Sequence, residues 1–313
     1  MSDIWTMGEL LAEIMRPKAG MSLQEPGVFL GPFPSGAPGI FIDTAARLGH
    51  SAAIVSGVGE DDFGRSILER LRHDGVSVEL VASYPNRSTG VAFVTYFRDG
   101  TRRFLFHWDG TPAVLARAPQ PEQIRGARYF HVMGCSLMAN EAFRREVFAA
   151  VERFAEAGAR ITFDPNIRFE LLAGRAVEDI VGPVLRRCSI LFPGEKEAQI
   201  LGGSGKTEAA VQALFRRYPL EILVLKRGKR GCTVYSGGQA LEVPAYRVRE
   251  VDPTGSGDCF DAGFLCGLLE ARPMEECARV ASAVGALNAQ AFGPMEGLIS
   301  PSAVARLLRH KSG

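Results

Sequence analysis

The chain has 313 residues and a net charge of +1 at neutral pH, with 46% hydrophobic and 23% charged residues. A chain of this length buries a large core and forms one large domain or two small ones. The near-neutral charge argues against a nucleic-acid partner and against a membrane surface. No apolar run approaches the roughly 20 residues of a membrane span.

The first residues and the cysteines indicate a cytoplasmic protein. Residues 1–5 lack the basic and then apolar design of a signal peptide. The six cysteines form no C-x-x-C pair and the five histidines are dispersed. Scattered cysteines are typical of buried thiols in a reducing compartment, so we expect neither a disulfide framework nor a zinc site.

Hydrophobic patterning predicts strands that alternate with helices along most of the chain. The predicted strands are 4–7, 52–58, 129–133, 160–163 and 221–225, and the predicted helices are 36–49, 65–74, 141–157, 195–201 and 275–291. Such alternation indicates βα units that build a parallel sheet.

Two segments depart from this alternation. Residues 16–35 are rich in proline and glycine and are therefore not helical. Residues 88–108 alternate like strands on both sides of Asp99-Gly100, which is a hairpin signal.

The most informative stretch is Asp252-Pro253-Thr254-Gly255-Ser256-Gly257-Asp258, which leads into a run of helical hydrophobic spacing. The first N–H groups of a helix have no internal partner, and glycines let the backbone approach a ligand closely. This turn therefore predicts an anion hole suited to phosphate. A carboxylate beside such a site fits a general base that deprotonates an attacking hydroxyl. The alternative is a helix N-terminal acid that only stabilises the helix dipole.

This stretch resembles the C-terminal motif D-T-x-G-A-G-D-x-F-x-x-G-F of the PfkB (ribokinase-like) carbohydrate kinases, with Pro253 in place of Thr and Ser256 in place of Ala. The resemblance extends over about 4–300. It implies a ribokinase-like three-layer α/β/α sandwich with a mostly parallel central sheet and a small β-sheet lid. The whole chain, 1–313, would form one such domain, with the lid built from segments near 10–33 and 88–108.

The resemblance also implies residues that bind the sugar. Family members place an acidic residue at the position of Glu13, and Glu9 is a second candidate. The family's G-G-x-x-x-N retains its second glycine as Gly36, but Ile40 replaces the Asn. Asp43 lies one helical turn later and would restore a polar contact, unless it is a surface acid.

Two further residues are candidates for substrate contact. Arg168 ends Asp164-Pro165-Asn166-Ile167-Arg168, which matches the family's D-x-N-x-R, with a structural salt bridge as the alternative role. Trp108 would stack on a sugar face or pack in the core.

The resemblance places nucleotide-binding residues after later strands. In the family's N-x-x-E motif, Gly194 replaces the Asn, and Glu197 would organise Mg²⁺ through water. The G-x-x-G nucleotide loop matches Gly228 and Gly231, and Lys226 would reach the ATP phosphates.

Together these features predict an ATP-dependent sugar kinase in which Asp258 deprotonates a sugar hydroxyl. The N–H groups of Gly255, Ser256 and Gly257 would stabilise the transferred γ-phosphoryl group, and the two glycines would also contact ATP. The expected cofactors are ATP and Mg²⁺, and some relatives also hold a potassium ion beside the counterpart of Asp252.

The substrate is expected to be a neutral ketohexose such as fructose or tagatose. In ketodeoxygluconate kinases the corresponding lid carries a Tyr and an Arg for the substrate carboxylate, whereas 106–108 here reads Phe-His-Trp. Kinases of ketodeoxygluconate or of nucleosides remain alternatives, as does a nucleotide- or sugar-binding regulator without turnover. Lids of this type pair into homodimers in some relatives.

Two other glycine motifs do not support different functions. Gly202-Gly203-Ser204-Gly205-Lys206-Thr207 ends like a Walker A loop but has Ile200 where the first glycine belongs and follows a predicted helix instead of a strand. The G-x-G at 57–59 lacks the last glycine of a dinucleotide fingerprint, which disfavours an NAD oxidoreductase.

Overall fold

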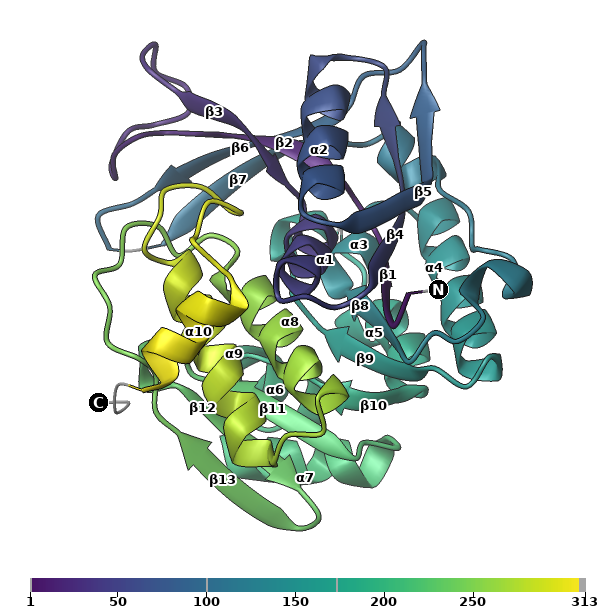
Figure 1. The fold of residues 1–313 in the computed structure, drawn as a ribbon, viewed down its shortest axis with the longest axis vertical. Coiled ribbons are helices and arrows are strands. Elements are labelled where there is room, and N and C mark those ends of the chain that lie inside the picture. Colours follow the sequence, from purple (N-terminus) through teal and green to yellow (C-terminus); the bar gives the residue numbers. More distant parts are fainter. Residues whose placement is uncertain (1, 100, 173, 310–313) are drawn as a thin grey trace.

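The computed structural model describes residues 2–99, 101–172 and 174–309, and its centre is a nine-stranded sheet in the order β13-β12-β11-β10-β9-β8-β1-β4-β5 (Figure 1). Its strands are β1 (Ile4–Met7), β4 (Ala52–Gly59), β5 (Val76–Tyr84), β8 (Tyr129–Met133), β9 (Arg160–Asp164), β10 (Cys188–Leu191), β11 (Ile222–Lys226), β12 (Cys232–Ser236) and β13 (Gln239–Val243). Only the pairs β11–β12 and β12–β13 are antiparallel among the neighbouring strands that the structure describes in this sheet.

Helices cover both faces of this sheet and give the molecule three layers (Figure 1). One face packs against α1 (Ala37–Arg47), α2 (Asp62–His73), α8 (Ser256–Leu269), α9 (Met274–Asn288) and α10 (Pro301–Leu308). The other face packs against α4 (Glu141–Glu156), α5 (Val177–Leu185), α6 (Glu195–Gly202) and α7 (Thr207–Arg217). The predicted three-layer fold with a mostly parallel sheet is confirmed.

Alternation along the strands divides the core between the two faces. Ile4 and Ile54 belong to the core beneath α1 and α8, whereas Trp5 and Val55 belong to the core beneath α4 and α5. Successive strand residues point to opposite faces, so buried strands are apolar on both sides. Among the described residues, no helix is both long and apolar enough to cross a bilayer.

Helix α8 can lie close against α9 because Gly263 and Gly267 of α8 have no side chain at the contact. A Cβ on Gly263 would lie 3.0 Å from the Cα of Ala281, and one on Gly267 would lie 3.0 Å from the Cα of Cys277. This close contact with α9 fixes the axis of α8, and with it the direction in which the N-terminus of α8 points.

A second sheet of four strands, here called the small sheet, lies at the upper left of Figure 1. Its order is β3-β2-β6-β7, formed by β2 (Leu11–Met15), β3 (Leu30–Ser35), β6 (Gly90–Tyr96) and β7 (Arg102–His107). Strands β6 and β7 pair antiparallel, as the hairpin signal predicts, although Gly100 of that signal lies outside the described residues.

Short helical segments connect the larger elements. They are η1 (Pro112–Leu115), η2 (Pro121–Ile124), α3 (Gly134–Leu137), η3 (Phe169–Leu171) and η4 (Gly228–Arg230). The loop between β2 and β3 is ordered by Arg16, which is almost fully buried and donates hydrogen bonds to the carbonyl oxygens of Ser22, Glu25 and Val28. The proline- and glycine-rich segment therefore folds around one guanidinium group.

Candidate active site

A cavity of about 260 Å³ lies between the small sheet and the carboxyl ends of the main-sheet strands. Residues at or just after five parallel strands line it: Glu9, Cys135, Asp164, Gly194 and Lys226. The carboxyl ends of parallel strands share one edge of the sheet, where ligands bind in open α/β folds. The small sheet and the start of α8 supply the other walls.

The glycine turn adopts the geometry that the sequence predicts for an anion hole. Gly255 is the residue that precedes α8, with φ of 77°, and a Cβ there would lie 2.5 Å from the Pro294 carbonyl oxygen. Only glycine tolerates both conditions. The first N–H groups of a helix have no acceptor inside the helix. Here the Ser256 amide donates to the Pro253 carbonyl oxygen at 3.2 Å, and Gly255 and Gly257 line the cavity. The Ser256 side chain does not line it, and its Oγ is buried without a partner among the described residues.

Asp258 lies in the first turn of α8 and lines the cavity with 8% of its surface exposed. The side-chain amide of Asn166 donates to its Oδ1 at 3.4 Å. Burial, followed by the neighbouring Asp164 charge, raises the pKa of Asp258 to about 7, against the opposing influence of Lys226 and Arg168. The carboxylate is therefore poised to exchange a proton near neutral pH.

Lys226 ends β11 beneath the glycine turn. Its ammonium group donates to Asp164 at 2.7 Å and to Asp261 at 3.1 Å, and it lies 3.8 Å from where a Cβ of Gly257 would be. Its main observed role is to neutralise buried carboxylates below the anion hole. Contact between Lys226 and ATP phosphates stays a prediction.

Glu197 connects two loops at the cavity. Its Oε1 accepts a hydrogen bond from the Ile167 amide at 2.8 Å and its Oε2 accepts one from the Gly194 amide at 2.7 Å. Burial and the nearby Asp164 charge raise the pKa of Glu197, so a cation here would stabilise its ionised form.

These buried oxygen donors fit magnesium chemically. Mg²⁺ prefers oxygen ligands and keeps several waters while it binds one or two carboxylates and substrate phosphates. Within the described ranges, no group of three or more His, Cys, Asp or Glu side chains is arranged as a metal cage. A magnesium ion held by Glu197 through water stays a prediction.

The predicted nucleotide loop lies outside the cavity described above. Gly228 and Gly231 have φ of 56° and 91°, and a Cβ on Gly231 would lie 2.0 Å from the Val243 carbonyl oxygen. Gly231 is thus required where β12 begins beside the end of β13. A role for either glycine in ATP binding stays a prediction.

Asp252 is buried, and neighbouring groups satisfy its carboxylate. Oδ1 accepts hydrogen bonds from the Tyr96 hydroxyl, the Thr254 amide and the Thr254 hydroxyl, and Oδ2 accepts one from the Gly293 amide at 2.9 Å. The carboxylate therefore does not need a cation to be satisfied. A potassium ion at Asp252 stays a prediction, and no chemical step is assigned to it.

Two buried acids from the beginning of the chain also line the cavity. Glu13 accepts a hydrogen bond from Ser35 at 2.5 Å through Oε2, whereas its Oε1 is buried without a partner among the described residues. Both oxygens of Glu9 are occupied, by Ser136 at 2.6 Å and by the Cys135 thiol at 3.2 Å. Glu13 is thus the better candidate for a sugar hydroxyl, and burial raises its pKa to about 7.

Gly36, Trp108 and Arg168 also line the cavity, as the sequence predicts. The guanidinium of Arg168 lies over the Phe104 ring at 4.9 Å, and its Nε is buried without a partner within the part of the chain that the structure describes. No ion pair of Arg168 occurs among these residues, so its side chain remains available to a ligand.

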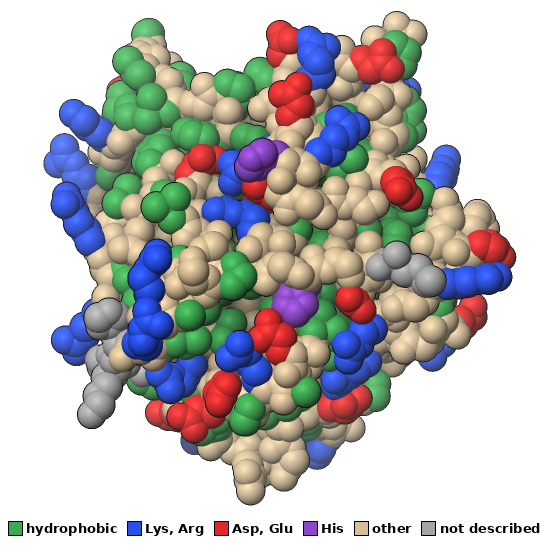
Figure 2. All heavy atoms as spheres, viewed as in Figure 1, with side chains coloured by type: hydrophobic (Ala, Val, Ile, Leu, Met, Phe, Trp, Pro, Cys, Tyr) green, Lys and Arg blue, Asp and Glu red, His purple; other side chains and the backbone are tan. Residues whose placement is uncertain are grey.

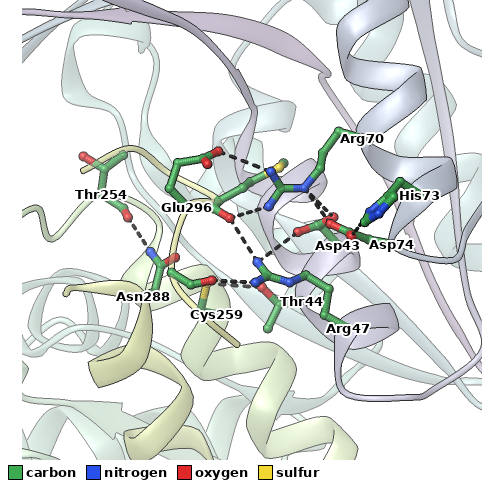
Figure 3. A network of polar contacts seen from close by, with 12 residues as sticks. Asp43, Thr44, Arg47, Arg70, His73, Asp74, Thr254, Cys259, Asn288 and Glu296 are labelled. Atoms are coloured by element: carbon green, nitrogen blue, oxygen red, sulfur yellow. Dashed lines mark hydrogen bonds and ion pairs between the residues drawn. The ribbon is translucent and has the colours of Figure 1, made fainter. Parts of the chain in front are cut away.

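The structure corrects the interpretation of Asp43. It does not line the cavity; it is fully buried between α1 and α2, 3.7 Å from Arg47 and 3.8 Å from Arg70 (Figure 3). Both arginines donate to the Met295 carbonyl oxygen, so the group fastens the loop after α9. Asp43 lies one turn further along α1 than Ile40, and there Arg70 of α2, rather than the cavity, is beside it at 3.8 Å.

Sequence reasoning missed two cavity residues. Arg102 and Phe104 belong to β7 and line the cavity with Phe106 and Trp108. Residues two apart on a strand share one face, so the position of Trp108 was a usable signal for Arg102. The small sheet therefore does bring an arginine to the cavity, although not at 106–108.

Comparisons with known proteins agree with this geometry. The model of the pfkB family of carbohydrate kinases matches residues 34–301. The chain is 32% identical to fructokinase-1 from Oryza sativa subsp. japonica, over 97% of this chain and 96% of that protein.

Solved structures with the same architecture carry the expected ligands. A provisionally named ribokinase II from E. coli, in complex with ATP and Mg²⁺, is 35% identical with a TM-score of 0.92, covering 99% of this chain and 100% of that one. A fructokinase double mutant from Vibrio cholerae, bound to fructose, ADP and potassium ion, is 26% identical with a TM-score of 0.85, covering 98% of each chain.

The buried Asp43 predicts a specific dependence of stability on pH. Burial raises the pKa of Asp43 to about 8, and the neighbouring Asp74 acts in the same direction, against the opposing charges of Arg70 and Arg47. The folded state thus holds this proton more tightly than the unfolded chain, and the stability it contributes at acid pH is lost as pH rises through about 8.

We therefore expect wild type to lose stability relative to Asp43→Asn between pH 5 and 8, with a slope of up to ~1.4 kcal/mol per pH unit. Denaturant unfolding of both proteins at several pH values measures this difference. Parallel stability curves for wild type and variant would show that Asp43 is ionised throughout.

Proposed function

The chain belongs to the pfkB family of carbohydrate kinases, and on that premise we propose that it transfers the γ-phosphoryl group of ATP to a hydroxyl of a ketohexose such as fructose or tagatose. The observation that carries the proposal is Asp258, a buried carboxylate beside free helix N–H groups in a cavity that also contains Glu13. The names of the relatives, fructokinases among them, support the choice of sugar.

In the proposed mechanism, Asp258 removes the proton from the sugar hydroxyl that attacks the γ-phosphorus. Its pKa of about 7 lets it accept that proton near neutral pH. The N–H groups of the glycine turn lie beside it and would stabilise charge that develops on the transferred oxygens. Positioning and electrostatics supply most of the rate in phosphoryl transfer, so these groups need only be held rigidly.

Magnesium, held through Glu197 and water, would shield the negative charge of the triphosphate. The protein's own part is to hold the half-buried Glu197 in place through the amides of Gly194 and Ile167. Lys226 offsets the nearby Asp164 and Asp261, which limits repulsion between these carboxylates and an incoming phosphate.

The small sheet is proposed to act as a lid. Its strands β2, β6 and β7 contribute Glu13, Ala92 and Phe104 to the same cavity that contains Asp258. A closed lid excludes water, which would otherwise compete with the sugar hydroxyl for the phosphoryl group.

A sugar acid is the second candidate substrate, and two arginines favour it. Arg102 and Arg168 both line the cavity, and either would suit a carboxylate. Against this, the acids Glu9 and Glu13 lie in the same cavity, and Arg168 opposes the rise in the pKa of both. The arginines therefore have local anions to balance, which keeps a neutral sugar the preferred substrate.

Pairing of two copies through the small sheet is also part of the proposal. Four large apolar side chains of this region are exposed: Val28, Leu30, Phe97 and Leu105. Apolar side chains gather at the upper left of Figure 2, over β3 and the loop before it, whereas charges of both signs are interspersed elsewhere on that face. A molecular-mass measurement in solution decides between one copy and two.

Replacement of the proposed base tests the mechanism directly. For Asp258→Asn we expect kcat to fall by about 10²–10⁴-fold, while the affinity for ATP stays within about threefold of wild type. Coupled ADP-release assays and calorimetric ATP titration measure the two quantities. Asp179→Asn, an exposed site on α5, is the matched control. Equal turnover in wild type and Asp258→Asn would rule out Asp258 as the base.

The raised pKa of Asp258 predicts the pH profile of the reaction. Only the ionised carboxylate accepts a proton, so kcat/KM for the sugar should rise with pH and level off above about 7. The pKa of Glu13 lies in the same range, so the fall of kcat/KM at acid pH reports the titration of both carboxylates together. Assays between pH 5 and 9 measure it, and a profile that stays flat down to pH 5 would contradict the assignment.

A substrate screen tests the choice of sugar. We expect the highest kcat/KM on fructose or tagatose, with lower values on aldoses, 2-keto-3-deoxygluconate and nucleosides. ATP consumption without acceptor supplies the background rate. Best turnover on the sugar acid would establish the second candidate and assign Arg102 and Arg168 to its carboxylate.

A further inference from the structure

Tyr96, the last residue of β6, joins the small sheet to the turn that leads into α8. Its hydroxyl donates to Asp252 Oδ1 at 2.5 Å and also contacts the Thr254 hydroxyl. The side chain is half-buried, and burial together with the Asp252 charge raises its pKa. The phenol therefore stays protonated and keeps its role as a donor to Asp252.

The carboxylate of Asp252 is a junction between three segments of the chain. It accepts hydrogen bonds from Tyr96 of the small sheet, from Thr254 of the glycine turn and from Gly293 of the loop after α9. Hydrogen bonds to an ionised acceptor are stronger than neutral ones. Removal of one donor from a buried carboxylate therefore weakens a connection that matters to all three segments.

A second contact lies beside the first. The Phe33 ring of β3 packs edge-on against Phe292, with centroids 6.0 Å apart, and lies 3.1 Å from where a Cβ of Gly293 would be. The small sheet thus contacts the loop after α9 at residues adjacent to the Asp252 junction. The Tyr96 hydrogen bond is the polar part of this contact, and the Phe33 packing is its apolar part.

The same junction fixes the turn that forms the anion hole. Thr254 directly precedes Gly255, and its carbonyl oxygen accepts a hydrogen bond from the Asn288 side chain at 2.7 Å (Figure 3). Movement of Tyr96 with the small sheet would therefore change the surroundings of Thr254, one residue from the helix N–H groups. The Tyr96 hydroxyl therefore connects closure of the small sheet over the sugar with the arrangement of the glycine turn.

We propose that Tyr96 is a positioning residue that couples closure of the small sheet over the sugar to the geometry of the glycine turn at the phosphate. The inference rests on the proposed function, because it assigns to Tyr96 the linkage between the binding of the sugar and the binding of ATP. By linkage, sugar then increases the affinity for nucleotide by the same factor as nucleotide increases the affinity for sugar.

The test compares Tyr96→Phe with wild type and with Tyr235→Phe, which removes a phenol hydroxyl from β12 in the main sheet. A non-hydrolysable ATP analogue is titrated calorimetrically with and without saturating fructose. In Tyr96→Phe we expect sugar-free affinity for the analogue within about threefold of wild type. The factor by which fructose increases the affinity for the analogue should be about tenfold smaller than in wild type. This is the size expected for the loss of one hydrogen bond to a charged group.

Amide hydrogen exchange of the unliganded proteins supplies a readout that needs no sugar. In Tyr96→Phe, both β6–β7 and the turn 252–255 should exchange about tenfold faster, with neither changed in Tyr235→Phe. Unchanged exchange in either segment would overturn the proposal, as would a full fructose effect in Tyr96→Phe. Failure of the proposed function is a separate result, namely no turnover of any ketohexose by wild type, and the exchange experiment still decides the role of Tyr96.

Discussion

The site depends on one close backbone contact, between the glycine turn and the loop after α9. Gly255 lies so near the Pro294 carbonyl oxygen that no side chain fits, and its left-handed conformation turns the chain directly into α8. The start of that helix therefore lines the cavity through Gly255 and Gly257, and Asp258 follows in the first turn. Arg47 and Arg70 support the same loop from behind, through the Met295 carbonyl oxygen.

Around this turn, charge balance decides what the cavity can do. Lys226 forms ion pairs with Asp164 and Asp261, and the charge of Glu197 also acts on it. Burial favours the neutral form of a carboxylate, and the surplus of acids strengthens that effect at Asp258. The positive charge of a magnesium ion would offset this surplus, and the raised pKa of Asp258 would suit proton transfer at neutral pH. The surplus of carboxylates over cations would thus favour both the binding of magnesium and proton transfer to Asp258.

Local patterns predicted the fold and the phosphate side of the site, because both depend on residues close in sequence. Strand–helix alternation gave the parallel sheet, and the glycine turn with Asp258 could be recognised from a few adjacent residues. Residues whose roles depend on how separate elements pack were harder to predict. Asp43 was assigned to the cavity from helical spacing alone, but the position of α2 determines its partners. Tyr96 and Asp252 are far apart in sequence, so their contact had no sequence signal, whereas alternation along β7 would have revealed Arg102.

This division has a physical consequence for specificity. The main sheet and α8 supply the groups proposed to bind phosphate, and their positions are fixed by buried ion pairs and by a glycine that cannot be replaced. The small sheet supplies Glu13, Arg102 and the aromatic face of β7 to the cavity, and these are the groups proposed to contact the sugar. Side chains on β7 can therefore change the preferred sugar without disturbing the phosphate chemistry. That freedom ends at Tyr96, because its hydroxyl is where the small sheet contacts the turn of the anion hole.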